Sequence, residues 1–255
     1  MNDIVSRLFN FIAFARPMIF SQLLMISIGL TDTIVLGMLG TEELSSGGLV
    51  NSYELLATIV VTGFGIGVIP VNGRAFGLSD KDGLANNFAA GFALFLILVA
   101  IGCLGLTGLP LFLSWLDISS EIVSRGRTYS YLMAVSFIFG SLAVFMRFYL
   151  ISINGAKYLD WIFLGAFAVN LALNLLLAGL VVEQISFGLI GIAISTVVTN
   201  VCLILVLIQQ VKKNLPEGKR RAARSVIGMV VPRIIGDSIV EGPIAPSDRN
   251  RSMAA

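Results

Sequence analysis

Residues 89–113 read AAGFALFLILVAIGCLGLTGLPLFL, an apolar run without a single charged side chain. An α-helix needs about 20 such residues to cross the hydrocarbon core of a bilayer. Over the whole chain, 56% of the 255 residues are hydrophobic and 13% are charged, whereas a typical soluble domain has about 25% charged residues. A soluble fold could not bury this much apolar surface. The composition therefore predicts that lipid is the solvent for most of the chain.

Six apolar windows along the chain have the length of a membrane span. They cover residues 17–39, 49–70, 89–113, 129–150, 161–182 and 187–210. We therefore expect an all-α, polytopic transmembrane bundle of six helices within residues 1–211. The first window is too long, and too interrupted by Asp32, for a cleavable signal peptide, so we expect it to remain as the first span.

The placement of basic residues predicts the topology. Loops 40–48 and 183–186 lack Lys and Arg, whereas loops 74–86 and 151–160 carry them, and cytoplasmic loops are enriched in these residues. A basic cluster also follows the last window: Lys212, Lys213, Lys219, Arg220, Arg221 and Arg224. Nucleic-acid binding is the competing interpretation of such a cluster, but its place directly behind an apolar helix favours a role in topology. We expect both termini on the cytoplasmic side of the cell (inner) membrane.

Three features qualify this topology. The loop after the third window holds Arg125 and Arg127, although the positive-inside rule would place it outside. Arg147 falls at the cytoplasmic end of the fourth window, where we expect its side chain to extend to water. Residues 212–255 should form a basic cytoplasmic segment and a disordered tail, because Pro232 and Gly236 interrupt its short apolar runs.

The residue types present argue against an enzyme. Histidine is absent, which removes the usual general base and the commonest zinc ligand. The two cysteines, Cys103 and Cys202, lie inside apolar windows and indicate neither a disulfide framework nor a metal cluster. The run Gly63-Phe-Gly-Ile-Gly67 superficially matches a nucleotide-binding pattern, but it follows an apolar helix and no strand. We expect no cofactor and no nucleic-acid partner.

A few polar residues interrupt the apolar windows at similar depths. At a rise of about 1.5 Å per residue, Asp32, Asn174 and Thr196 lie at one level below the outer surface, with Asn170 one turn deeper and Glu54 slightly nearer the outside. A charged carboxylate in hydrocarbon is costly, so Asp32 should face the bundle interior, and intramembrane acids mark functional sites by default. The alternative is that these side chains only fix helix packing through hydrogen bonds.

Several segments together resemble the multidrug and toxic compound extrusion family. The segments are Pro17-Met-Ile-Phe-Ser-Gln22, Asp32-Thr33, Gly37-Met-Leu-Gly40, the stretch 63–77, Arg147 before Asn154-Gly155, Asn170-Leu-Ala-Leu-Asn174, and Gly188-Leu-Ile-Gly-Ile-Ala-Ile-Ser-Thr196. Their order and spacing over residues 10–210 make the combination specific. The resemblance implies cation-coupled export of amphipathic or cationic compounds by two six-helix lobes that alternate access.

The resemblance also implies roles for individual residues. Asp32 would take part in proton or sodium coupling, with Asn170, Asn174 and Thr196 around it as the cation- or proton-binding site. We expect substrate binding at Gln22 and Glu54. In many relatives a second carboxylate stands at the position of Asn174, so a sodium site would be weaker here and proton coupling through Asp32 is favoured.

The resemblance covers one lobe, whereas the family needs two. The chain is expected to be either a half-transporter that works as a homodimer or with a second lobe, or a truncated product with little activity. Six spans would allow two copies to lie in the same orientation. Two further alternatives stay open: a flippase for a lipid-linked precursor, and a non-transporting membrane subunit that associates through Gly- and Ala-rich helix faces.

Overall fold

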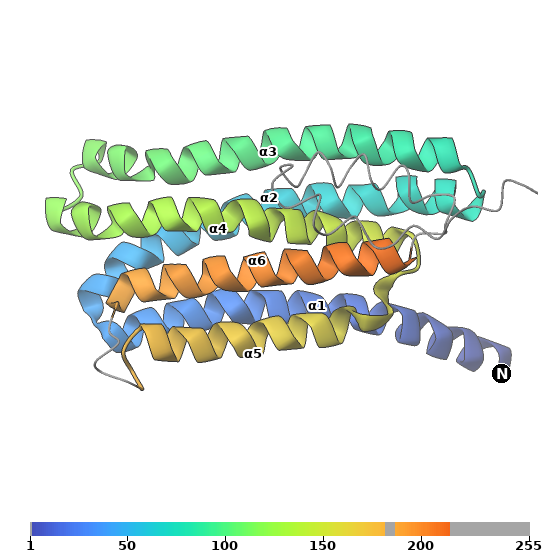
Figure 1. Cartoon of the computed structure of the whole chain (residues 1–255), viewed down its shortest axis with the longest axis horizontal. Helices are drawn as coiled ribbons and strands as arrows, with labels where there is room; N and C mark the ends of the chain where they lie inside the picture. Colours follow the sequence, from blue (N-terminus) through green and yellow to red (C-terminus); the bar gives the residue numbers. More distant parts are fainter. Residues whose placement is uncertain (1, 182–186, 215–255) are drawn as a thin grey trace, which may run out of the picture. The chain divides into compact units, whose positions relative to one another are not determined.

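The computed structural model describes residues 2–181 and 187–214, and this part of the chain folds into a helical bundle (Figure 1). The long helices are α1 (Asn2–Leu39), α2 (Thr41–Gly77), α3 (Lys81–Trp115), α4 (Ser120–Ser152), α5 (Leu159–Leu177) and α6 (Gly188–Asn214). A short 3₁₀ turn, η1 (Ala156–Tyr158), joins α4 to α5. The predicted basic cluster beyond Lys213 and the predicted disordered tail lie outside the described residues.

All six long helices are long and apolar enough to cross a membrane. This confirms the prediction of an all-α bundle of six transmembrane helices. Several helices are longer than the apolar windows in the sequence. The 37 residues of α2, for example, extend over about 55 Å, compared with a hydrocarbon core of about 30 Å. The helix ends therefore have the length to project beyond the core.

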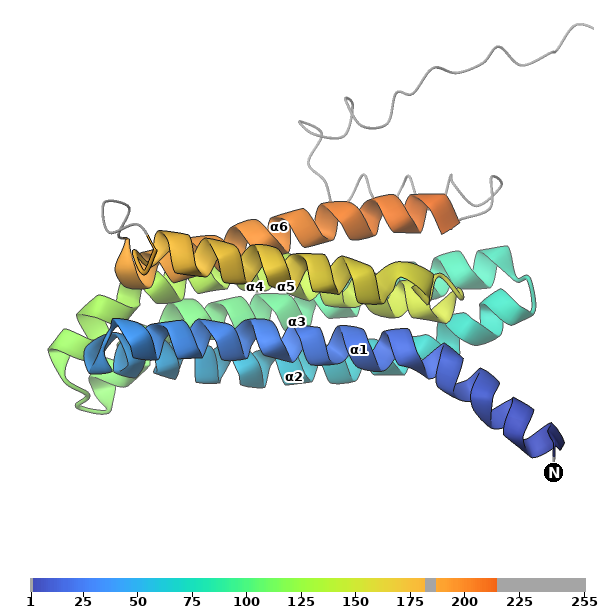
Figure 2. The same cartoon turned by 90° about the horizontal axis from the view of Figure 1, so that it is seen from below.

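The helix boundaries follow from local chemistry. Gly40 adopts a φ of 149° between α1 and α2, a conformation that residues with a Cβ rarely reach, so the chain reverses within one residue. At the start of α3, the side chain of Asp80 accepts a hydrogen bond from the backbone N–H of Gly83 at 2.9 Å, which caps the helix. Pro17 lies inside α1, which bends in its N-terminal part (Figure 2), because proline removes one helical hydrogen bond.

Helix α4 forms the centre of the bundle. In its spanning window 78% of the residues are buried, compared with 17 to 44% for the other five helices. It packs on α2, α3 and α6, while α5 packs on α1 and α6. Small residues allow close approach: the ring of Phe148 lies against Gly65 of α2, and the ring of Phe137 lies against Gly102 of α3. The outer faces of α1, α2 and α3 carry exposed apolar side chains, as lipid contact requires.

Candidate functional site

Asp32 of α1 is the centre of a buried polar group. Only 2% of its surface is exposed. Asn174 of α5 donates from Nδ2 to Oδ1 of Asp32 at 2.5 Å, and Thr196 of α6 donates from Oγ1 to Oδ2 at 2.9 Å. Each carboxylate oxygen therefore has a donor from a different helix, and the three helices converge on one charged side chain.

A second layer of polar side chains orients the first. Asn170, one turn before Asn174 on α5, accepts from Asn174 Nδ2 at 3.2 Å. Ser195 of α6 donates to Oδ1 of Asn174 and also to the carbonyl oxygen of Ile192 at 2.8 Å. The orientation of the Asn174 amide is thereby fixed, because its oxygen accepts a hydrogen bond from Ser195 while its nitrogen donates one to Asp32.

The structure thus brings together all four residues that we assigned to ion binding: Asp32, Asn170, Asn174 and Thr196. It adds Ser195, which was not among the predicted site residues. The adjacent hydroxyls of Ser195 and Thr196 at the predicted depth were a usable signal. Asn170 Nδ2 is fully buried and has no hydrogen-bond partner, so this group retains unused hydrogen-bonding capacity.

The site combines one carboxylate with neutral oxygen ligands. Across the part of the chain that the structure describes, no three His, Cys, Asp or Glu side chains come together. A cation at Asp32 would therefore be held by one carboxylate beside amide and hydroxyl oxygens, the ligand types that hard cations prefer. The same carboxylate is also able to carry a proton. Both chemistries are compatible with this arrangement of donors and acceptors.

Glu54 of α2 lies near this group, but at a different level from the one predicted. Asn51 donates to Oγ1 of Thr33 at 3.5 Å, and Gly47 lies against Leu36, so residues 51 and 32 are nearly level in these antiparallel helices. Glu54 is then about 4 Å farther from the α1–α2 turn than Asp32, and not closer to it. The prediction was wrong because it counted residues from assumed span ends.

Gln22 is the second predicted substrate-binding residue, and its side chain is hydrogen-bonded to Arg147 of α4. Arg147 of α4 donates from Nη1 to Oε1 of Gln22 at 2.8 Å and from Nη2 to the carbonyl oxygen of Met18 at 3.3 Å. Its guanidinium also lies over the rings of Phe148 and Phe163, 4.9 and 5.6 Å from their centroids. Gln22 is about 15 Å along α1 from Asp32. The structure therefore does not bring Gln22 and Glu54 together.

The expectation that Arg147 extends to water was wrong. Only 2% of this residue is exposed. Neutral acceptors on α1 and two aromatic faces take the place of water around the guanidinium. The sequence places Arg147 along its helix but does not say which way the side chain points, and here it points into the bundle.

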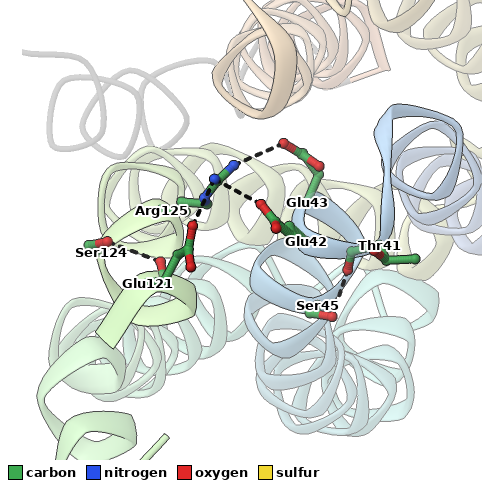
Figure 3. Close-up of polar contacts among 7 residues, drawn as sticks. All are labelled: Thr41, Glu42, Glu43, Ser45, Glu121, Ser124 and Arg125. Atoms are coloured by element: carbon green, nitrogen blue, oxygen red, sulfur yellow. Dashed lines mark hydrogen bonds and ion pairs between the residues drawn. The ribbon is translucent and has the colours of Figure 1, made fainter. Parts of the chain in front are cut away.

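Arg125 occupies the end of the bundle where α1 turns into α2 (Figure 3). Its guanidinium pairs with Glu42 at 2.8 Å and Glu43 at 3.4 Å, both in the first turn of α2, and with Glu121 of α4 at 3.0 Å. One arginine is thus matched by three carboxylates. Arg125 is one of the residues that depart from the positive-inside rule, and in the structure three acidic side chains surround it.

These observations define the class of the protein as a multi-pass α-helical membrane protein with a polar centre inside the bundle. The particular family follows from comparison with known proteins. The family model described as MatE matches residues 17–176, more than half of the chain, so the chain belongs to this family. This confirms the resemblance to multidrug and toxic compound extrusion transporters, over roughly one lobe. Members of this family are transporters and not enzymes.

Relatives of the chain include multidrug resistance proteins. The chain is 27% identical over 188 residues to the multidrug resistance protein NorM of Burkholderia vietnamiensis, and 30% identical over 193 residues to the probable multidrug resistance protein NorM of Burkholderia mallei. Each match covers 72% of this chain and 40% of the relative. The chain therefore spans less than half of the length of these relatives.

Solved structures show the same fold. The chain is similar to a MOP superfamily transporter from Pyrococcus furiosus, with a TM-score of 0.66 and 18% identity over 84% of this chain and 49% of that protein. It is also similar to the Vibrio cholerae MATE transporter VcmN in its bent form, with a TM-score of 0.60 and 20% identity over 85% of this chain and 51% of that protein. The fold thus corresponds to about half of each solved transporter.

Proposed function

We propose that this chain is one lobe of a cation-coupled antiporter that exports amphipathic or cationic compounds by alternating access. The observation that carries the proposal is the buried carboxylate of Asp32, which receives hydrogen bonds from Asn174 and Thr196 on two other helices. The names of the NorM relatives support drugs and other toxic compounds as the exported class. The proposed location is the inner membrane, with both termini in the cytoplasm.

The coupling step would act through the hydrogen bonds of Asp32. An ionised carboxylate only accepts hydrogen bonds, whereas a protonated one must donate one. Both oxygens of Asp32 now accept, so protonation requires at least one contact with α5 or α6 to rearrange. A ligand shifts a conformational equilibrium only by binding one form better than the other. A proton on Asp32 meets this condition, because it changes which contacts between α1 and its neighbours are favourable.

The ligand set favours a proton over sodium as the coupling ion. Asp32 is the one carboxylate in direct contact with Asn174 and Thr196, and its nearest partners are neutral. Sodium would leave its hydration shell for a single negative charge and a few neutral oxygens. A proton needs only the carboxylate itself and acceptors for its hydrogen bond, which the amide oxygens on α5 supply after a rotation.

Alternating access would involve a second six-helix lobe. The chain covers about half of the solved transporters to which it is similar. The other half would be a second lobe or a second copy of this chain, and the exported compound would lie between the two. The lipid bilayer is the remaining partner in this proposal.

The test is efflux of a fluorescent cationic dye into inverted vesicles that carry the protein. D32N keeps the shape of the side chain and removes its titration, so we expect transport to fall by roughly a hundredfold, the upper range for coupling between sites. D117N is the matched control, because Asp117 is an exposed acid in the α3–α4 turn. Full transport by D32N would show that the proposed coupling is wrong. Binding of an anionic lipid precursor without any dye export would instead favour a flippase.

A further inference from the structure

Glu54 lies on the buried face of α2. Val50 and Val61 on the same face are 2% and 1% exposed, and Gly65 continues it. Glu54 is four residues after Val50 and seven before Val61, the spacing that keeps residues on one side of a helix. This side faces α1 and α4, since Gly47 lies against Leu36 and Gly65 against a ring of α4. The other residues on this face are apolar or small. A carboxylate among them is costly within a membrane and therefore indicates a function.

The polar neighbours of Glu54 connect it to the Asp32 site. One turn earlier, Asn51 accepts a hydrogen bond from the hydroxyl of Tyr129 at 2.7 Å and donates to Thr33, which adjoins Asp32 in sequence. Tyr129 is fully buried on α4. Two carboxylates, from α1 and α2, therefore share one polar region inside the bundle.

The two carboxylates differ in access and in partners. Asp32 is 2% exposed, and both of its oxygens are occupied by donors. Glu54 is half-buried, and none of the Lys and Arg side chains described in the structure forms an ion pair with it. Asp32 is thus placed to hold a small ion such as a proton. Glu54 is placed to meet a larger ligand that brings its own positive charge.

We propose that Glu54 binds the positive charge of a lipophilic organic cation, and that this binding is linked to Asp32 by repulsion between the two carboxylates. The inference rests on the proposed function of Asp32. A cation bound at Glu54 favours the ionised form of Asp32 and so promotes release of its proton. By reciprocity, a proton on Asp32 weakens cation binding at Glu54 to the same extent. The two ligands then exclude one another, as antiport requires, without sharing a contact.

This arrangement also supplies a second acid to a site that lacks one on α5. Asn174 is neutral and is committed to hydrogen bonds with Asp32, Asn170 and Ser195. The second carboxylate near this site is that of Glu54, which comes from α2 and is half-buried.

The first experiment measures binding of tetraphenylphosphonium to the purified full chain in mild detergent. We expect E54Q to weaken binding by about tenfold or more, as loss of a buried charge partner does. E54D keeps the charge and should lie between E54Q and the wild type. E42Q is the matched control, because Glu42 is an acid of the same helix engaged with Arg125 at the helix end. Wild-type affinity in E54Q, or an equal loss in E54D and E54Q, would overturn the proposal.

The second experiment measures proton release on tetraphenylphosphonium binding in weakly buffered solution. The wild type should release protons, and D32N should bind the probe without releasing them. If D32N releases as many protons as the wild type while E54Q loses binding, then Asp32 is not the coupling group, and the proposed function fails while the cation site at Glu54 stands. If E54Q binds tetraphenylphosphonium normally and D32N abolishes proton release, then the cation site at Glu54 fails while the proposed function of Asp32 stands.

Discussion

Two buried charges on different helices, Asp32 of α1 and Arg147 of α4, both have neutral hydrogen-bond partners but are suited to different tasks. Each is 2% exposed, and each is held by neutral groups. Asp32 receives hydrogen bonds from Asn174 and Thr196, whereas Arg147 donates to Gln22 and to a backbone carbonyl of α1. Among the described residues, neither has an ion-pair partner.

The difference lies in what the charge is able to do. A carboxylate gains and loses a proton readily and changes from acceptor to donor when it does. A guanidinium keeps its protons, so its contacts do not depend on the chemistry of a transport cycle. The comparison indicates that Asp32 is the variable contact between α1 and the rest of the bundle. Arg147 of α4 is the permanent contact, and it meets α1 at Gln22, about 15 Å along α1 from Asp32.

Removal of Arg147 should have the largest effect on stability. R147A leaves Gln22 and the Met18 carbonyl without their donor and opens space between Phe148 and Phe163, so we expect a loss of about 3 kcal/mol. R147K keeps the charge but not the planar fork, and should lose about half as much. The measurement is thermal unfolding in detergent, with R127A on the exposed face of α4 as the control. If R147A unfolds at the wild-type temperature, then Arg147 is not the permanent contact that distinguishes it from Asp32.

Introduction of a second carboxylate at Asn174 should change the ion that the site accepts. N174D places two acids within hydrogen-bond distance of each other, and such a pair requires a shared proton or a bound cation. We expect about a tenfold gain in apparent affinity for sodium, measured as sodium-stimulated dye efflux. N86D adds the same charge at an exposed position of α3 and should leave sodium without effect. Sodium-independent transport by N174D would show that this site does not choose the coupling ion.

Ser195 should contribute less, because it acts on Asp32 through Asn174. S195A removes the donor to Asn174 Oδ1 and should reduce stability by about 1 kcal/mol. Freed from Ser195, the amide of Asn174 is able to rotate away from Asp32, so the pH at which efflux is half-maximal should also move. S45A, which removes an exposed hydroxyl on α2, should move neither value. A change in stability with an unaltered pH profile would limit Ser195 to packing.

Arg125 should have the smallest effect, although it makes three of the four ion pairs among the described residues (Figure 3). The Arg125 side chain is 43% exposed, and those of Glu42 and Glu121 are 56% and 63% exposed. Exposed pairs contribute little because water and salt screen them. We expect R125Q to change the unfolding temperature by no more than about 2 °C. The same scan at high salt should give the same result for wild type and variant. A large loss would mean that the α2–α4 contact at this end is more important than its exposure indicates.

The fold class was accessible from sequence because lipid imposes a simple length rule. Windows such as 89–113 have no soluble explanation, and each of the six became a helix. The grouping of Asp32 with Asn174 and Thr196 was also within reach, since depth follows from counting residues along a helix of constant rise. Glu54 shows where counting failed, because the assumed end of its span was wrong.

By itself, therefore, the sequence determined how many helices there are and which polar residues lie at similar depths. Only the tertiary structure decided how those residues are placed: Arg147 points inward to Gln22, Ser195 donates to Asn174, and Glu54 lies on the face of α2 that packs on α1 and α4. The physical reason is that position along a helix depends on its own residues. The rotation of a helix about its axis depends on the packing of its neighbours, which residues distant in sequence supply.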